Sequence, residues 1–372
     1  MDFNENFQRF RVSDEIYDSW TKNRQPYIAT FELLSACNLK CIHCYLGVHR
    51  QKLEQLTYEQ VIHVLDELVE AGVLQIALTG GECMLREDFP LIYEYAKKSG
   101  FLVTVFTNLT NLTDDILSKF IELPPFSVEI SLYGASNETY KRITGEAVYD
   151  TVISNIEKLV SHNINVSIKT PIIKQNKDDQ QKLEEIARSF NTELRVGFAM
   201  SPTIDHELYP EEFALDLCTR FKHEVRDVNR NDIKLKESDI NNPWGVRYYA
   251  GEFAPQFICN PGVSDVFVDY KGNISPCVAF RSIGKNIFET PLKDIWKSFA
   301  WIKQLPAQPG NKCIHCESRY FCNICVAEQI DLFNNYCNTP EDVCIYAQAR
   351  KKFYKDGVST SDILNFIESS KI

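Results

Sequence analysis

The chain has 372 residues, of which 44% are hydrophobic and 24% charged, and its formal net charge is −11. These values are typical of a globular protein with one large and one smaller domain, and the negative charge argues against nucleic acid or an anionic membrane surface as a partner. Because no apolar run is long enough for a membrane helix and the N-terminus lacks the features of a signal peptide, we expect a cytoplasmic protein without a membrane partner.

From about residue 27 the chain alternates short apolar runs with amphipathic stretches. The apolar runs predict strands at 27–34, 74–79, 102–107, 127–132, 165–170 and 194–200. A helix is predicted at 57–71, where Val61, Leu65 and Leu68 recur at helical spacing. Further helical patterns start near Phe89, Thr113, Tyr149 and Asp178. Strands that alternate with helices imply right-handed βαβ units, and six of them predict a partial (β/α)6 TIM-like barrel with its chemistry at the C-terminal strand ends.

The alternation stops near residue 205, which predicts a different organisation for the rest of the α/β chain. We expect an N-terminal extension at 1–26, the barrel at 27–204 and a charged helical bridge at 205–255. A cysteine-rich domain at 256–348 should begin with a hairpin near 266–275, and 349–372 should end the chain with a helix.

The thirteen cysteines are unevenly distributed along the chain. Three lie between 37 and 44, and six lie between 313 and 344. A cytosolic compartment keeps thiols reduced, and an odd count fits a disulfide framework badly. We therefore interpret the clustered cysteines as metal ligands.

The first group is the segment Cys37-Asn38-Leu39-Lys40-Cys41-Ile42-His43-Cys44-Tyr45, directly after the first predicted strand. Three thiolates at this spacing can hold one face of a cubic iron–sulfur cluster. Such clusters normally take four cysteine ligands, so one iron would be open to a small molecule. The alternative is a zinc loop with His43 as the fourth ligand, but a loop after the first barrel strand favours the cluster.

This CxxxCxxC loop with its following aromatic residue, Tyr45, resembles the hallmark of radical S-adenosylmethionine (SAM) enzymes. The resemblance implies that Cys37, Cys41 and Cys44 are catalytic and hold a [4Fe-4S] cluster whose open iron binds S-adenosylmethionine. It also implies an electron donor such as flavodoxin or ferredoxin, and a 5′-deoxyadenosyl radical that abstracts hydrogen from the substrate. Tyr45 is then expected to contact the cofactor.

The end of the second predicted strand carries another match, Thr79-Gly80-Gly81-Glu82. It resembles the GGE motif of the family, which implies that Gly80, Gly81 and Glu82 bind the methionyl amino group. The alternative is an ordinary strand-to-helix turn, which two glycines also suit. Cys83 stands where the family usually has proline, and we interpret it as a buried structural thiol.

Later strand ends carry weaker matches to cofactor-binding positions of the same family. Asn108 belongs to a segment that resembles the family's TNG sequence, with Leu109 in place of glycine. Ser131 matches a serine used for the ribose or carboxylate of the cofactor. Lys169 ends the fifth predicted strand, where the family often has a polar contact. Polar residues at strand ends are common, so ordinary solvation is the alternative.

The second group of cysteines begins with Cys259 and Cys277, which flank Gly272, and continues as Cys313-x2-Cys316-x5-Cys322-x2-Cys325, with Cys337 and Cys344 beyond. A zinc ribbon would separate its CxxC pairs by about 15–20 residues. The five residues here leave only a compact zinc site as the alternative.

The spacing of the second group resembles the SPASM domain, an auxiliary-cluster module of peptide-modifying radical enzymes. The resemblance implies two auxiliary [4Fe-4S] clusters, with Cys313, Cys316, Cys322 and Cys344 on the outer one and Cys259, Cys277 and Cys325 on the inner one. One spacing departs from the pattern, since two residues instead of three separate Cys322 from Cys325. We expect an open iron on the inner cluster unless Cys337 supplies a fourth ligand.

By resemblance, enzymes with both regions modify peptides, so we expect a ribosomally made precursor peptide as the substrate. The expected change is a cross-link, an epimerisation or a backbone or side-chain rearrangement. The 26 N-terminal residues are too few for a peptide-recognition domain, so we expect a leader peptide to bind the core directly or through a separate leader-peptide recognition protein. Formylglycine formation is an alternative, although Val278 replaces the aspartate expected after Cys277. Modification of a small molecule or haem precursor, and a non-catalytic iron–sulfur or zinc scaffold, also remain open.

Overall fold

The computed structural model describes residues 19–20, 22–230, 261–304, 313, 316–322, 324–333 and 339–370. The predictions made for Cys259 and Cys337 lie outside the described residues, as does most of the predicted helical bridge.

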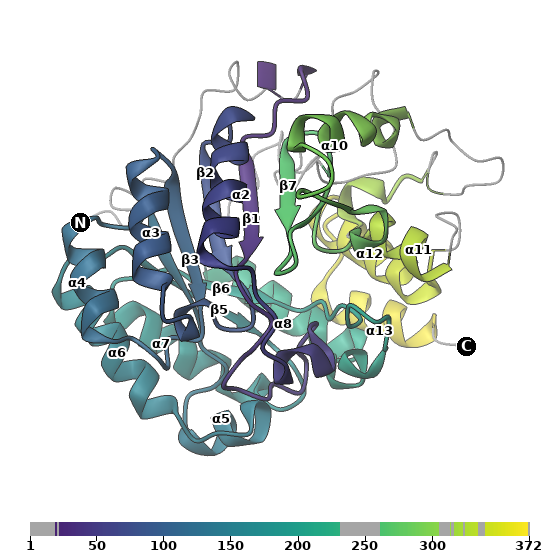
Figure 1. Cartoon of the computed structure of the whole chain (residues 1–372). Helices are drawn as coiled ribbons and strands as arrows, with labels where there is room; N and C mark the ends of the chain where they lie inside the picture. Colours follow the sequence, from purple (N-terminus) through teal and green to yellow (C-terminus); the bar gives the residue numbers. More distant parts are fainter. Residues whose placement is uncertain are drawn as a thin grey trace.

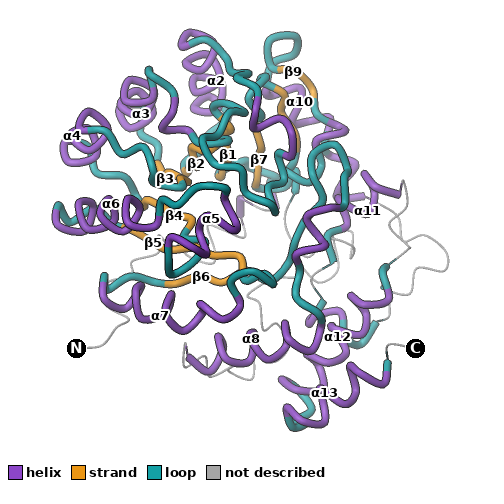
Figure 2. The backbone as a smooth tube through the Cα atoms, turned by 90° about the horizontal axis from the view of Figure 1, so that it is seen from below, coloured by secondary structure: helices purple, strands orange, loops and turns teal. Residues whose placement is uncertain are grey.

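Six parallel strands form the centre of the molecule, each close to its predicted place. They are β1 (Ile28–Glu32), β2 (Gln75–Thr79), β3 (Leu102–Thr107), β4 (Ser127–Ser131), β5 (Val166–Pro171) and β6 (Leu194–Gly197). Seen along the strands in Figure 2, they follow an open arc with the helices on its outer side. The predicted partial (β/α)6 barrel is confirmed.

Six helices follow these strands: α2 (Tyr58–Glu70), α3 (Phe89–Lys98), α4 (Asp114–Glu122), α5 (Asn137–Thr144), α6 (Tyr149–Ser161) and α7 (Gln180–Ser189). A capping box between Thr57 and Gln60 starts α2, so the predicted start is correct to one residue. The prediction missed α5, because its sequence is mostly polar. Ser136 caps the N-terminus of α5 and Gly145, at φ 82°, ends it.

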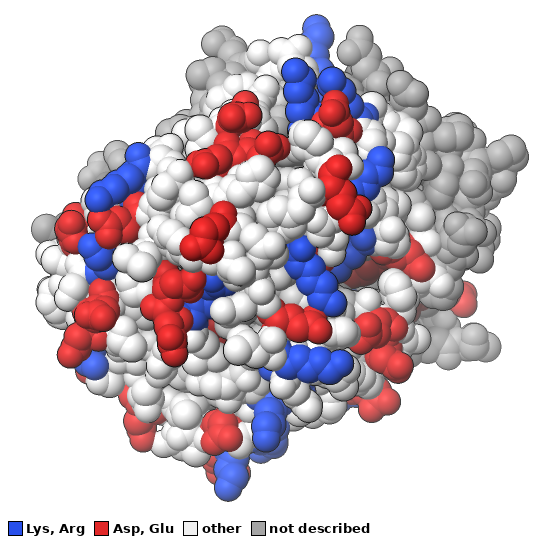
Figure 3. Space-filling model, viewed as in Figure 1, with Lys and Arg blue, Asp and Glu red and all other residues white. Residues whose placement is uncertain are grey.

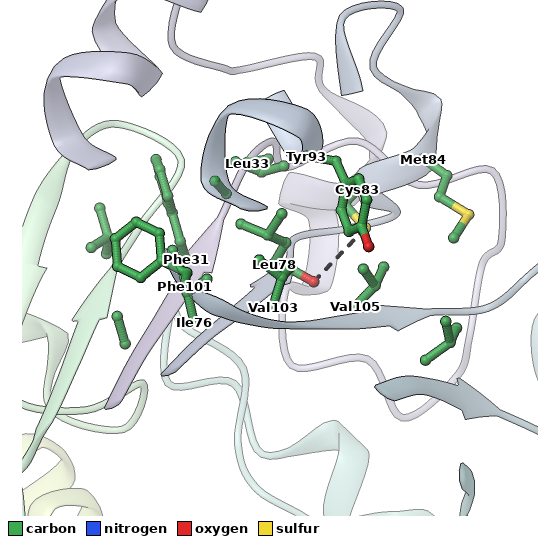
Figure 4. Packing of buried hydrophobic residues seen from close by; sticks show 14 of the residues in the cluster. Phe31, Leu33, Ile76, Leu78, Cys83, Met84, Tyr93, Phe101, Val103 and Val105 are labelled. Carbon is green, nitrogen blue, oxygen red and sulfur yellow. Dashed lines mark hydrogen bonds between the residues drawn. The ribbon is translucent and has the colours of Figure 1, made fainter. Parts of the chain in front are cut away.

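The main core lies between the outer face of the sheet and these helices. Residues at every second strand position, such as Phe31, Leu78 and Val103, are fully buried there (Figure 4). Cys83 is buried in the same core, where its thiol donates to the carbonyl oxygen of Leu78 at 3.9 Å. The interpretation of Cys83 as a buried thiol is confirmed.

The C-terminal part of the chain extends the same sheet. The strand β7 (Asp265–Val268) pairs with β1 in parallel, and β8 (Asn273–Ser275) and β9 (Lys285–Asn286) follow in antiparallel pairing. The resulting sheet has the order β6-β5-β4-β3-β2-β1-β7-β8-β9. The hairpin near 266–275 is confirmed, but its union with the barrel was not predicted. A strand pair more than 200 residues apart leaves no local sequence signal.

The remaining helices of the described chain follow β6 in the sequence and lie toward the side of the molecule where β7 lies (Figure 1). They are α8 (Leu217–Arg230), α10 (Leu292–Ser298), α11 (Val326–Phe333), α12 (Glu341–Tyr354) and α13 (Thr360–Ser369). Of these, α8, α12 and α13 share a second core that includes Phe221, Ile345 and Ile363. The helix α12 continues through residue 348, where the sequence suggested a boundary.

Short 3-10 helices occupy several connections: η1 (Gly47–Gln51), η2 (Cys83–Leu85), η3 (Lys177–Asp179), η4 (Tyr209–Phe213), η5 (Arg281–Ile283), η6 (Ala300–Gln304) and η7 (Arg319–Phe321).

Acidic and basic side chains are interspersed on the face shown in Figure 3, and its described residues form no broad basic patch. Within the described part of the chain, every helix is too short or too polar to cross a bilayer.

Candidate active site

A cavity of about 900 Å³ lies inside the arc and reaches the C-terminal ends of β2, β3 and β4. On one side it meets Cys277, which follows β8. The predicted site residues on its wall are Cys37, Cys41, Cys44, Tyr45, Gly80, Gly81, Asn108, Ser131 and Cys277. Residues from both predicted cysteine groups therefore line one cavity.

The loop of Cys37, Cys41 and Cys44 is held by backbone hydrogen bonds to two other segments. The amide of Cys37 donates to the carbonyl oxygen of Arg50 at 3.0 Å. The amides of Lys40 and Ile42 donate to the last turn of α5 at 2.8 and 2.9 Å. The helix α5, which the sequence did not predict, is thus one of the two segments that hold this loop by backbone hydrogen bonds.

Each of the three thiols has hydrogen-bond donors directed at its sulfur. Cys37 accepts from the Leu39 amide at 3.4 Å and from Asn108 Nδ2 at 3.6 Å. Cys41 accepts from the side chain of Tyr133. Cys44 accepts from two backbone amides and from the side chain of Arg50. Donors of this kind stabilise thiolate ligands.

In the absence of a bound metal, burial has the opposite effect, because it disfavours the charged thiolates and keeps the thiols protonated. It raises the pKa of Cys37 to about 12, and it raises the pKa of Cys41 and Cys44 as well. A bound cationic group would replace the protons, because it supplies the positive charge that buried thiolates need. Three buried thiols with directed donors fit an iron–sulfur cluster.

The Gly80-Gly81 turn packs against the segment that leads into Cys37. The amide of Gly81 donates to the carbonyl oxygen of Leu34 at 2.9 Å, and Gly80 has φ 145°. A Cβ atom on Gly81 would overlap the carbonyl oxygens that precede Cys37. Glycine is therefore required by the neighbouring backbone, while the other side of the turn faces the cavity.

The carboxylate of Glu82 lies in the interior, behind the cavity wall. It accepts from the amide of Asn108 at 2.7 Å, from the hydroxyl of Thr107 at 2.8 Å and from the amide of Met84 at 3.1 Å. Burial raises its pKa, and these donors partly offset that rise. In this position Glu82 ties the glycine turn to the end of β3.

Ser131 lies on the cavity wall, whereas Lys169 does not. The ammonium group of Lys169 forms an ion pair with Glu129 and lies 3.9 Å from the ring centre of Phe106. Because Phe106 lines the cavity, Lys169 lies next to this part of the wall, and it pairs in register with Ser131 on β4.

Tyr45 belongs to a polar network that joins the two cysteine regions. Its hydroxyl donates to Glu32 at 2.7 Å, and Arg281 donates to both oxygens of Glu32 at 2.7 and 3.0 Å. Tyr45 directly follows Cys44, and Arg281 lies four residues after Cys277. Glu32, at the end of β1, is completely buried. This ion pair connects the first loop to the segment after Cys277.

Sequence reasoning missed Glu32, Arg50, Tyr133 and Arg281, and it considered His43 only as a zinc ligand. The His43 ring lies 5.2 Å from that of Tyr133, and its Nδ1 has no hydrogen-bond partner among the described residues. Burial lowers the pKa of His43 to about 4. Tyr133 lies two positions after Ser131, so strand alternation could have indicated it. Within the described residues, no three His, Cys, Asp or Glu side chains are arranged to hold a single metal ion.

The described cysteines of the second group fall into two places. The pKa of Cys322 is raised to about 11, mainly by burial and in smaller part by the charges of Cys313, Cys344 and Cys316. The proximity of these four agrees with the set expected for the outer cluster. Cys277 and Cys325 instead pack against the main core of the barrel.

Two families match the chain in the corresponding regions. Residues 31–189 match the Radical SAM superfamily, and residues 259–317 match the SPASM iron–sulfur cluster-binding domain. The first match includes Cys37, Cys41 and Cys44. The second includes Cys259, Cys277, Cys313 and Cys316 and ends before Cys322.

The sequence matches to two relatives with assigned activities extend over most of the chain. It is 30% identical to the sporulation killing factor maturation protein SkfB of Bacillus subtilis, over 78% of this chain and 69% of SkfB. It is 27% identical to an AdoMet-dependent haem synthase of Methanosarcina barkeri, over 88% of this chain and 98% of the synthase. The fold is similar to that of Streptococcus suis SuiB, with a TM-score of 0.66 and 17% identity over 85% of this chain and 78% of SuiB. SuiB has also been crystallised with its precursor peptide SuiA.

Proposed function

We propose that this chain, which belongs to the radical SAM superfamily and carries a SPASM iron–sulfur cluster-binding domain, is an enzyme that modifies a ribosomally made precursor peptide. The observation that carries the proposal is the single cavity lined both by the loop of Cys37, Cys41 and Cys44 and by Cys277. A substrate in this cavity would lie between the radical site and the auxiliary region.

The cofactor site is proposed at the wall formed by the three N-terminal cysteines. With bound S-adenosylmethionine and a reduced [4Fe-4S] cluster, it would supply a 5′-deoxyadenosyl radical for hydrogen abstraction. Cys37, Cys41 and Cys44 would hold the cluster, while Tyr45, Gly80, Gly81, Asn108 and Ser131 would contact the cofactor from the cavity wall. Glu82 would act from behind the wall, where it holds the glycine turn in place, and Lys169 would hold Phe106 in place from beside it.

The auxiliary region, proposed at 256–348, would hold two further [4Fe-4S] clusters. The outer one would take Cys313, Cys316, Cys322 and Cys344, which the pKa of Cys322 indicates to be neighbours. The inner one would take Cys259, Cys277 and Cys325. Because Cys277 lines the cavity, the inner site would be the one within reach of the substrate, for electron transfer or for binding a substrate thiolate.

A peptide substrate is supported by two of the proteins to which the chain is similar. SkfB is the maturation protein of the sporulation killing factor, and SuiB binds a precursor peptide. In this chain Val278, on the cavity wall, is 45% exposed, so the site is accessible next to Cys277. The proposed partners are a precursor peptide, a separate leader-peptide recognition protein, and flavodoxin or ferredoxin as electron donor.

A haem precursor is the second candidate substrate. It is favoured by the similarity to the Methanosarcina barkeri haem synthase, which extends over 98% of that protein. A cavity of about 900 Å³ would accommodate either substrate class.

One anaerobic assay with S-adenosylmethionine and a reductant distinguishes the two candidate substrates, a precursor peptide and a haem precursor. The reconstituted enzyme is given the short peptides encoded near its gene or haem-precursor tetrapyrroles, and 5′-deoxyadenosine and the mass of each substrate are measured. We expect a mass change only with a peptide. The variant Cys37→Ala/Cys41→Ala/Cys44→Ala should form no 5′-deoxyadenosine while it keeps its C-terminal iron. Turnover of a tetrapyrrole alone would favour the second candidate, and activity of the triple variant would exclude both.

A further inference from the structure

Arg50 lies beside the radical-type cysteine loop and was not indicated by any sequence motif. It belongs to η1 and lines the cavity. Its carbonyl oxygen accepts from the Cys37 amide at 3.0 Å, and its guanidinium donates to the carbonyl oxygen of Gly47. The same side chain forms a hydrogen bond with the sulfur of Cys44. One residue thus contacts the first and the last cysteine of the loop.

The donors to the three sulfurs differ in charge. Cys37 accepts from an amide side chain, that of Asn108, and Cys41 accepts from the phenol of Tyr133. Of the side-chain donors that the described residues direct at these sulfurs, Arg50 is the only cation. Its Nε is buried and has no hydrogen-bond partner in the described part of the chain. A buried guanidinium N–H without a partner leaves one donor that a hydrogen-bond acceptor in the cavity could satisfy.

Reduction of an iron–sulfur cluster by one electron adds one negative charge at this wall. A cation that donates to a ligand sulfur stabilises the more negative state, and the low dielectric of a buried site strengthens the effect. Glu82 acts in the opposite direction, because its charge raises the pKa of Cys37. Arg50 is therefore the group that offsets a buried carboxylate near the same loop.

We propose that Arg50 is a positioning residue that raises the reduction potential of the cluster held by Cys37, Cys41 and Cys44. The inference rests on the proposed function, in that these cysteines must hold a cluster. The electron would come from the flavodoxin or ferredoxin donor, and Arg50 would make the cluster easier for that donor to reduce.

The test is an anaerobic redox titration of the radical-site cluster followed by electron paramagnetic resonance, without S-adenosylmethionine. For Arg50→Gln we expect the ratio of reduced to oxidised cluster at a fixed potential to fall about tenfold, which is about 59 mV for a one-electron couple. Arg50→Lys keeps the positive charge but lacks the planar guanidinium with its several donors. We therefore expect its ratio of reduced to oxidised cluster to fall about threefold. The control Lys40→Gln removes an exposed charge of the same loop and should leave the ratio unchanged.

The possible outcomes are distinct. A potential of Arg50→Gln equal to that of the wild type would overturn the inference and leave the proposed function intact. A wild-type chain without a cluster at these cysteines would instead overturn the proposed function. If Arg50→Gln does not hold the cluster, Arg50→Lys decides: a ratio about threefold below that of the wild type supports the inference, and the wild-type ratio overturns it, because lysine lacks the planar guanidinium. An equal drop in Lys40→Gln would attribute the effect to the net charge of the loop.

Discussion

Leu109 has a backbone conformation that glycine adopts more readily. Its φ is 56°, although its side chain is completely buried in the core. The amide of Leu109 donates to Thr107 at 2.8 Å, and its carbonyl oxygen accepts from Asn155 at 2.9 Å. A left-handed conformation costs an L-residue about 1–2 kcal/mol, whereas truncation of a buried leucine to alanine costs about 2–5 kcal/mol. Burial therefore outweighs strain, and leucine can replace the glycine usual in related sequences.

We predict that the strain at this position can be measured by comparing two truncations. Both Leu109→Ala and Leu109→Gly should be destabilised, but the glycine variant should be more stable than the alanine variant by about 1 kcal/mol, because glycine has no Cβ in the left-handed region. Urea unfolding under anaerobic conditions measures the difference. At Val105, in the extended strand β3, the order should be reversed. An alanine variant at 109 that is as stable as the glycine variant would contradict the explanation.

Single residues of the candidate site could be predicted from the sequence only where a motif fixes them. The spacing of Cys37, Cys41 and Cys44 was sufficient to predict their common loop. The direction of Glu82, whose carboxylate turns into the interior to meet the amide of Asn108, was not predictable, because this partner lies directly after another strand, β3. Arg50 was missed for the same reason, since its contact with Cys44 depends on the fold of η1.

The ion pair of Glu32 with Arg281 is the main polar link between β1 and the segment after Cys277. Its carboxylate is completely buried and receives three hydrogen bonds, one of them from Tyr45. The Arg281 guanidinium also lies 4.5 Å from the ring centre of Phe267, on β7. Loss of one partner from such a pair leaves an uncompensated buried charge, which costs about 3–5 kcal/mol.

We predict that Glu32→Gln and Arg281→Met each lower the free energy of unfolding by about 3–5 kcal/mol. The double variant should lose less than the sum of the two, because neither charge is left alone. Anaerobic urea unfolding of the reconstituted proteins measures the free energy of unfolding of the wild type, the two single variants and the double variant. As a control, Lys297→Gln removes the exposed pair of Lys297 with Asp294 and should change the stability by less than about 1 kcal/mol. Additive losses in the double variant would mean that the two residues act independently.

The strands could be predicted from the sequence because each is a short apolar run followed by an amphipathic helix. Of the nine strands in the described part of the chain, this pattern predicts six, and the turn between β7 and β8 predicts their hairpin. The pairing of β7 with β1 did not follow, because the pattern of one strand does not identify a distant partner. The short helix α5 was missed because its polar sequence resembles a loop, yet its last turn holds the loop of Cys37, Cys41 and Cys44.

At the scale of the whole molecule, the continuous sheet determines which cysteines can reach the radical site. Through β7 and β8 it places Cys277 on the wall of the same cavity as Cys37. Cys344 instead lies on α12, in the part of the chain whose core is shared with α8 and α13. Arg350 on α12 pairs with Glu224 on α8 and donates to the carbonyl oxygen of Phe321, next to Cys322. Cys322 and Cys344 are thus attached to the helical core, whereas Cys277 and Cys325 pack against the core of the barrel.

This division leads to a prediction about the auxiliary clusters. Reconstituted protein should hold about twelve irons if all three clusters have four irons each, and one inner iron should be open to exchangeable ligands. Added substrate thiol or a small thiol should therefore change one auxiliary spectroscopic signal and leave the others unchanged. Stoichiometric zinc with about four irons would instead mean that the second cysteine group is a zinc module.

Matched variants assign the responding cluster. Cys322→Ala should lose the outer cluster and keep the response to thiol, because its sulfur lies with Cys313, Cys316 and Cys344. Cys277→Ala should lose the response, because Cys277 is on the cavity wall that the thiol can reach. A response that disappears in Cys322→Ala and persists in Cys277→Ala would place the open iron on the outer cluster, away from the radical site. Electron transfer would then be the better role for the inner cysteines, since a thiolate held at the outer cluster would lie outside the cavity where hydrogen abstraction is proposed to occur.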